Sequence, residues 1–277
     1  MSFVQRLRTA QHEFASRVCV GLDPIPERLP APYADYRTDP IALAAFCVAI
    51  IEATAPHCCA YKPNLAFFEA HGAAGYAALE SVIAAIPDTH LCIADAKRGD
   101  IGHTARFYAR GLFDHLGADA ITAAPYMGRD SILPFLRTAE RGVFVLTRTS
   151  NAGSADLQEC PVDAKGDLPR EPVYQRIARL VQRWSAHPES QGDAGLVVGA
   201  TAPEALAELR EVCPTLPFLV PGVGAQGGDA RAAVNAAVTE DGLILVNSSR
   251  SILYAHDGPN FAEAAAEAAA ELQGALG

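Results

Sequence analysis

Short apolar runs alternate with longer amphipathic segments along the whole chain of 277 residues. Between the runs, apolar residues return every three or four positions in stretches such as "DPIALAAFCVAIIEATA" and "APEALAELREVC", which predicts helices. Eight repeats of strand and helix predict a parallel sheet, and the number eight favours closure into a (β/α)8 TIM barrel, an α/β fold. The eight runs of strand length cover residues 17–23, 58–64, 91–97, 120–125, 142–150, 194–200, 217–223 and 242–249.

The pattern shows no linker or internal repeat beyond this alternation, so we expect residues 1–277 to form a single TIM-barrel domain. One connection is unusually long: residues 151–172, after the fifth strand, are rich in Gly, Pro and Asp and predict an inserted loop. In a barrel this loop would lie at the C-terminal face of the strands, where it could partly cover a binding site. A solvated insertion without function is an equally good interpretation.

Composition narrows the class of protein. The net charge of −10 is spread along the chain without a basic stripe, which argues against binding to nucleic acid. We expect no apolar run to be long enough to cross a bilayer, and the first residues lack the apolar stretch of a secretory signal, so we expect a soluble cytoplasmic protein. The seven cysteines form no CxxC pair, which favours reduced thiols in the core.

Charged residues interrupt the third strand in "IADAKRGDIGHTA". Side chains two apart share a face of a strand, so Asp95 and Lys97 are expected to point together. A salt bridge at the barrel mouth would explain this pair, and a helix cap near Ile101 would explain Asp100. However, Asp23 and Lys62 stand at the ends of the first and second strands. This many charges at neighbouring strand ends predict a site.

The neighbours of Lys97 indicate its chemistry. A lysine that forms a Schiff base must be neutral, whereas adjacent carboxylates favour the ammonium form, so Lys97 is expected to donate a proton. With Lys62 it would form an alternating array of lysine and aspartate that provides fixed charge. Such an array suits a reaction in which a negative group leaves and a carbanion is protonated.

A glycine-rich loop follows the seventh strand. Residues 221–230, "PGVGAQGGDA", match GxGxxG, but a dinucleotide-binding fold carries that motif after its first strand. In a barrel, the loops after strands 7 and 8 commonly bind phosphate. Gln226, Ser249 and Arg250 are therefore predicted to bind a phosphate group, with Arg250 as a planar donor.

Together these motifs resemble those of the orotidine 5'-phosphate decarboxylase family, over nearly the whole chain. The family's DxKxxDI motif stands here as "DAKRGDI", accompanied by "GLDP", "YKPN", "PGVGAQGG" and an arginine just after strand 8. The long insertion and the segments "KPNLAFFE" and "TSNAGSADLQ" resemble the longer bacterial, type 2 branch. The resemblance implies a carboxy-lyase that converts orotidine 5'-monophosphate to UMP and CO2 in pyrimidine biosynthesis.

The resemblance also implies roles for single residues. Lys97 would protonate carbon 6 of the pyrimidine, and Asp95 would lie beside the substrate carboxylate. Asp100 would reach into the neighbouring subunit's site, so that a homodimer with shared active sites is the catalytic unit. The remaining implied contacts are Asp23 and Lys62 with the ribose, Thr104 with the ribose across the interface, Ser150 with the base, and Gln226 and Arg250 with the phosphate.

No cofactor motif is visible in the sequence, so we expect fixed charge to replace the electron sink that decarboxylation usually needs, with no metal or cofactor. One alternative is a metal-dependent sugar-phosphate decarboxylase or lyase of the same superfamily. Those enzymes place an acidic metal ligand where this chain has Lys62, and a cation there would repel Mg²⁺. The other alternative is a non-catalytic nucleotide-binding barrel, although phosphate binding alone does not need Asp95, Lys97 and Asp100. His103 is not assigned to the site.

Overall fold

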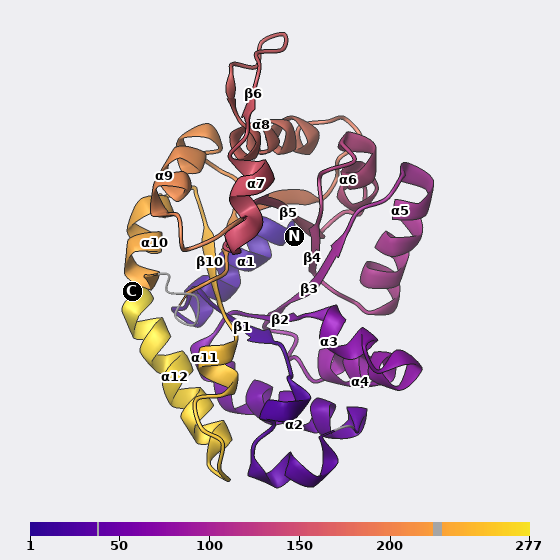
Figure 1. The fold of residues 1–277 in the computed structure, drawn as a ribbon, viewed down its shortest axis with the longest axis vertical. Coiled ribbons are helices and arrows are strands. Elements are labelled where there is room, and N and C mark those ends of the chain that lie inside the picture. The colour runs from indigo at the N-terminus through magenta and orange to yellow at the C-terminus, as the bar shows by residue number, and fades with distance from the viewer. Residues whose placement is uncertain (38, 224–228) are drawn as a thin grey trace. The chain divides into compact units, whose positions relative to one another are not determined.

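The computed structural model describes residues 1–37, 39–223 and 229–277. Eight parallel strands form a closed barrel in the order β1-β10-β9-β8-β5-β4-β3-β2, and helices lie between consecutive strands along the chain (Figure 1). The predicted TIM barrel and all eight predicted strands are thus confirmed. The strands are β1 (Val18–Leu22), β2 (Ala60–Pro63), β3 (Leu91–Arg98), β4 (Ala120–Ala123), β5 (Gly142–Arg148), β8 (Asp193–Val198), β9 (Phe218–Val220) and β10 (Ile244–Ser248).

Several helices begin where the sequence supplies a capping side chain. Asp39 accepts a hydrogen bond from the Ile41 amide at the start of α2, and Pro40 occupies the first helical position. The helices are α1 (Phe3–Glu13), α2 (Pro40–Thr54), α3 (Leu65–Glu69), α4 (Gly72–Ala84), α5 (Gly102–Ala109), α6 (Arg129–Leu136), α7 (Ala155–Gln158), α8 (Val173–Ser185), α9 (Pro203–Val212), α10 (Ala230–Ala237), α11 (Arg250–Leu253) and α12 (Phe261–Leu276).

Contacts within the chain group into two compact units. Unit 1 contains residues 1–4, 97–110 and 122–246, and unit 2 contains residues 5–96, 111–121 and 247–277. The division passes through β3 between Ala96 and Lys97. The expectation of a single domain stays a prediction.

Unit 2 has a core that contains three fully buried aromatic side chains, those of Phe46, Tyr61 and Phe68. The Tyr61 side chain is fully buried, and its hydroxyl donates to the Ile51 carbonyl at 2.8 Å and lies 3.0 Å from Thr54 Oγ1. The hydrogen bonds of Tyr61 therefore join β2 to α2 within this core.

The expectation that no apolar run could cross a membrane was wrong on length. Among the described residues, one helical stretch, Pro40–His57, is long and apolar enough. Its Leu43, Phe46 and Ile50 side chains are fully buried in unit 2, where α2 packs against α4 and α12. A core helix surrounded by other helices carries the same apolar composition as a membrane span, so this stretch is accounted for by packing.

Unit 1 packs the first residues of the chain against its own strands. The rings of Phe3 and Phe144 meet edge to face with centroids 5.8 Å apart. A Cβ atom at Gly142 would lie 2.6 Å from the Phe3 ring, so only glycine leaves room for this contact.

The segment predicted as an inserted loop, residues 151–172, has secondary structure of its own. It contains a 3₁₀ turn (Ala152–Ser154), α7, and two short antiparallel strands, β6 (Pro161–Val162) and β7 (Glu171–Pro172). The ribbon between β6 and β7 projects beyond α8 in Figure 1. The segment is therefore a small structured element that follows β5.

Six of the seven cysteines are buried, and Cys160 is exposed. Burial raises the pKa of the Cys213 thiol to about 11 and that of Cys58 to about 12. These thiols stay protonated at neutral pH, in agreement with the prediction of core cysteines.

Candidate active site

A buried ion pair joins β2 and β3 in unit 2. Lys62 Nζ donates to Asp95 Oδ2 at 2.7 Å, and the two side chains are 5% and 8% exposed. The parallel register places Lys62 opposite Gly21 of β1, and Asn64 opposite Asp95. Because each buried charge is neutralised by the other, the strand ends can carry ions that an apolar core would not tolerate alone.

The charge state of Lys62 follows from its neighbours. Burial lowers the pKa of the Lys62 amine, but the negative charges of Asp95 and Asp23 raise it by more, and the net change is an increase. Lys62 is therefore an ammonium ion at neutral pH and does not act as a nucleophile.

Two buried oxygen atoms near the end of β1 and in β10 lack a partner. Among the side chains that the structure describes, Asp23 Oδ1 and Asn247 Oδ1 are buried and accept no hydrogen bond. An unpaired buried acceptor costs about 1–3 kcal/mol, which a bound donor such as a hydroxyl group would recover. These oxygens mark unit 2 as a place for a polar ligand.

Ser249, one of the predicted phosphate-binding residues, lies next to Gly21 of β1. A Cβ atom at Gly21 would lie 1.9 Å from Ser249 Oγ, so glycine is required for this close approach. Ser249 precedes α11, which begins at Arg250, and the Arg250 side chain is exposed. Gln226, the third predicted phosphate ligand, lies outside the described residues.

Tyr254 ties the segment after β1 to the segment after α11. Its hydroxyl accepts from the Ile25 amide at 2.5 Å and donates to the Asp23 carbonyl at 3.1 Å. The Arg28 guanidinium lies over the Tyr254 ring, 4.2 Å from its centroid. The backbone that carries the Asp23 carboxylate is thus fixed from the C-terminal part of the chain.

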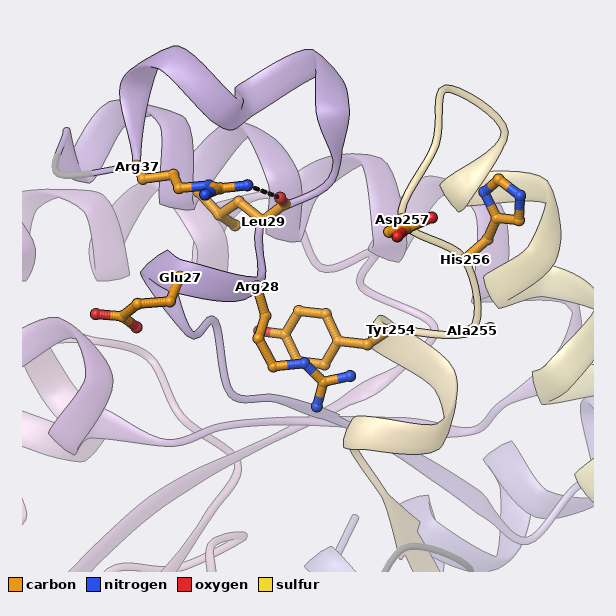
Figure 2. A pocket seen from close by; sticks show the side chains of 8 residues that line it. All are labelled: Glu27, Arg28, Leu29, Arg37, Tyr254, Ala255, His256 and Asp257. Atoms are coloured by element: carbon orange, nitrogen blue, oxygen red, sulfur yellow. Dashed lines mark hydrogen bonds between the residues drawn. The ribbon is translucent and has the colours of Figure 1, made fainter.

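A cavity of about 430 Å³ lies beside this tyrosine (Figure 2). Figure 2 shows the Arg28 side chain across the Tyr254 ring and Arg37 hydrogen-bonded to the Leu29 carbonyl. Its lining residues are Glu27, Arg28, Leu29, Arg37, Tyr254, Ala255, His256 and Asp257. It contains none of the side chains predicted to bind substrate.

Lys97 lies in unit 1 and has an unusual backbone. Its φ angle is +47°, in the left-handed region that residues other than glycine rarely adopt. The Lys97 amide donates to Thr122 Oγ1 at 3.0 Å, and the Lys97 side chain is exposed. Lys97 lies within β3, but its backbone departs from the regular pleat on which the predicted shared face with Asp95 rests, so the shared face stays a prediction. Strain of this kind concentrates at functional sites.

Asp100 does not cap the helix that follows it. α5 begins at Gly102, its capping position is Ile101, and no side chain caps it. Asp100 Oδ1 instead accepts from the adjacent Ile101 amide at 2.7 Å. The helix-cap interpretation of Asp100 is therefore wrong. Thr104 is half-buried on the first turn of α5.

Ser150 follows β5 in unit 1 and is half-buried. A Cβ atom at Gly199 would lie 2.8 Å from Ser150 Cβ, so the chain after β8 passes close to it. The predicted residues thus fall into two described groups: Asp23, Lys62, Asp95, Ser249 and Arg250 in unit 2, and Lys97, Asp100, Thr104 and Ser150 in unit 1.

Two residues of this region were missed by sequence reasoning. Asn247 had a detectable signal, because it is a polar residue of β10 that directly follows the apolar run "GLILV". Tyr254 had none, since its partners Asp23 and Ile25 lie more than 200 positions away in the chain. Within the described ranges, no group of three or more His, Cys, Asp or Glu side chains is placed to hold a metal ion.

Comparison with known proteins identifies the family to which the chain is similar. The model of the "Orotidine 5'-phosphate decarboxylase / HUMPS family" matches residues 16–268. The orotidine 5'-phosphate decarboxylase of Roseiflexus castenholzii is 50% identical over 278 residues, which cover 100% of this chain and 97% of the relative.

Solved structures show the same barrel. The OMP decarboxylase of Leishmania donovani is 41% identical, with a TM-score of 0.82 over 100% of this chain and 99% of that chain. The UMP synthase of the same organism is 44% identical with a TM-score of 0.83, and this chain covers 56% of its length. From the matched family model and from relatives aligned along their full length, the chain belongs to the orotidine 5'-phosphate decarboxylase / HUMPS family.

Proposed function

We propose that this chain decarboxylates orotidine 5'-monophosphate to UMP and CO2 as a step of pyrimidine biosynthesis, without a metal or cofactor. The observation that carries the proposal is the buried Lys62–Asp95 pair, which holds fixed charge at the ends of β2 and β3. The relatives named as orotidine 5'-phosphate decarboxylases support the choice of substrate.

In the proposed reaction, the bond between carbon 6 and the carboxylate breaks and CO2 leaves. The electron pair left on carbon 6 takes a proton from the Lys97 ammonium group, which becomes neutral. Asp95, held by Lys62, lies beside the substrate carboxylate and disfavours the charged ground state, while Lys62 stabilises charge that develops on the base.

The other contacts bind the nucleotide. Asp23 and Lys62 bind the ribose, and the unpaired buried oxygen of Asp23 supports a hydroxyl donor there. Ser150 binds the base, and Gln226, Ser249 and Arg250 bind the phosphate.

We further propose a homodimer in which Asp100 and Thr104 serve the partner's site. Support comes from exposed apolar side chains in unit 1: Ile101 is 56%, Tyr126 86% and Met127 47% exposed. Ile101 directly precedes α5, and Tyr126 and Met127 shortly precede α6. Because α5 packs against α6, these side chains belong to neighbouring parts of unit 1. Apolar side chains exposed together on a soluble enzyme indicate an interface.

Subunit complementation tests the shared site. Lys97→Ala and Asp100→Asn should each be inactive alone. In a refolded equimolar mixture about half of the dimers are mixed, and each mixed dimer has one of its two sites intact. The mixture should therefore recover about a quarter of wild-type activity. No recovery in mixtures that contain mixed dimers would show that Asp100 acts within its own subunit.

A cytoplasmic location is also proposed, and the free buried cysteines support a reducing compartment.

The test of the function is loss of orotidine 5'-monophosphate absorbance on adding the purified protein in the presence of EDTA. Turnover that is insensitive to the chelator is expected. Turnover that requires Mg²⁺ would favour the metal-dependent lyase, and UMP binding without turnover would favour the non-catalytic barrel. The metal-dependent lyase is disfavoured because the Lys62 ammonium group already donates a hydrogen bond to the Asp95 carboxylate. A Mg²⁺ ion at the end of β2 would need that carboxylate as a ligand.

A further inference from the structure

The C-terminal end of β5 departs from regular strand geometry just before Ser150. Leu146 pairs with Val197 and Arg148 pairs with Val198, so Thr147 is an extra residue in this ladder. Such a bulge redirects the chain at the end of a strand. The direction of Thr149 and Ser150 must therefore be held by contacts other than the regular ladder.

Gln158 of α7 supplies two of these contacts. Its Oε1 accepts from the Thr149 amide at 2.8 Å, and its Nε2 donates to Thr149 Oγ1 at 2.8 Å. The Thr149 hydroxyl then donates to Asn151 Oδ1 at 2.6 Å. The oxygen and the nitrogen of the Gln158 side-chain amide thus both form hydrogen bonds with Thr149, the residue that precedes Ser150.

Arg148 connects the same strand end to the residues on either side of α7. Its guanidinium donates to the Thr149 carbonyl at 3.0 Å, and also to the Ser154 hydroxyl and the Glu159 carboxylate. Ser154 is buried, and the Arg148 side chain is only 14% exposed. The Arg148 contacts with the Thr149 carbonyl and the Ser154 hydroxyl are therefore partly shielded from water, whereas the Glu159 side chain is 52% exposed. Hydrogen bonds that are shielded from water fix geometry more strongly.

The far end of the segment is also fastened. Glu171 is buried and accepts from Arg176 Nε at 2.8 Å and Arg179 Nε at 2.7 Å, both on α8. Arg176 also donates to the carbonyls of Asp163 and Pro169, at 3.1 and 2.7 Å. The segment is anchored at both ends, so α7 is a fixed support for Thr149.

We propose that Gln158 is a positioning residue: it holds Thr149 so that Ser150 faces the pyrimidine base, and the segment 151–172 serves this purpose. The inference rests on the proposed function, because Ser150 is the proposed contact to the base. It assigns a role to a segment that the sequence left open between a partial cover and a solvated insertion.

The test compares ligands with and without the base. UMP and ribose 5-phosphate share the phosphate and the sugar, so a defect at Ser150 should weaken UMP binding only. In Gln158→Ala, affinity for UMP is expected to fall about tenfold while affinity for ribose 5-phosphate stays within about twofold, as measured by calorimetry. Ser150→Ala should show the same selectivity, and the double variant should lose little more than either single one.

Two further variants keep the test decisive. Thr149→Val removes only the hydroxyl that Gln158 Nε2 donates to, and it should show a smaller loss with the same selectivity even if Gln158→Ala fails to fold. Leu157→Ala changes a side chain on α7 that is 52% exposed and should bind both ligands like wild type.

Equal losses for both ligands, or no loss in Gln158→Ala and Thr149→Val, would overturn the inference. So would additive losses in the Ser150 and Gln158 double variant. If wild type fails to decarboxylate orotidine 5'-monophosphate, the proposed function is wrong, while the comparison of UMP with ribose 5-phosphate still decides whether Gln158 positions Ser150.

Discussion

Lys62 and Asp95, from neighbouring strands of unit 2, form a hydrogen-bonded ion pair with 2.7 Å between Nζ and Oδ2, and both side chains are at most 8% exposed. A buried pair of this kind is a weak source of stability compared with apolar packing, but losing one partner is costly. The pair is therefore better explained by the charge it supplies to a site.

Removing one member should destabilise the protein more than removing both. Lys62→Met and Asp95→Leu should each lower the free energy of unfolding by about 3–5 kcal/mol, because each removes the opposite charge that lies closest to a buried ionic group. The double variant should regain much of this loss while staying inactive. Urea unfolding and the decarboxylase assay measure the two effects. Additive single losses would contradict the ion-pair explanation.

Lys97→Ala should abolish CO2 release and retain UMP binding, since the ammonium group is the proposed proton donor. Full residual turnover would refute that role. Lys97→Gly offers a matched comparison, because glycine adopts the φ of +47° without the steric cost that alanine carries. We expect Lys97→Gly to be equally inactive but about 1 kcal/mol more stable than Lys97→Ala in urea unfolding. Equal stability would show that the left-handed backbone is not strained.

The pH dependence of stability follows from the direction of the Lys62 shift. The pKa of Lys62 is raised, so its contribution is fully present below the unfolded value of about 10.4 and is lost only as pH rises through the higher folded value. The difference in unfolding free energy between wild type and Lys62→Met should stay constant from about pH 6 to about pH 9. Urea unfolding at several pH values measures it, and a decline within that window would mean that Lys62 titrates there.

Tyr254→Phe removes one hydroxyl and keeps the ring that contacts Arg28 and Phe46. Burial raises the pKa of Tyr254 to about 12, so the hydroxyl is an intact donor at neutral pH. Its loss frees the backbone at Asp23 and should lower kcat/KM about tenfold. Stability should fall by about 1–2 kcal/mol, because the Ile25 amide loses its acceptor. Arg28→Gln is the control, and an equal loss of activity there would assign the effect to the ring contact instead.

Local patterns in the sequence were sufficient for the barrel and for much of the candidate site. Strand length and helical periodicity are properties of neighbouring residues, so the alternation alone predicted all eight strands. Residues at the C-terminal ends of parallel strands must come to one face of a barrel, which is why Asp23, Lys62 and Asp95 could be grouped from their positions.

Tertiary structure decided the partners. The sequence pattern suggested Lys97 as a neighbour of Asp95, and it gave no sign of the hydrogen bond between Asp95 and Lys62, which lies 33 positions away on the adjacent strand. Tyr254 and Gln158 form hydrogen bonds with backbone groups, and the sequence gives no sign of such bonds because every residue carries the same backbone. The left-handed backbone at Lys97 likewise depends on its surroundings, among them the bond to Thr122. The sequence by itself determined which elements form and which residues stand at their ends, because those depend on short-range pattern. Only the folded chain decided which charges are paired and which loops hold them, because pairing depends on distances between residues remote in the sequence.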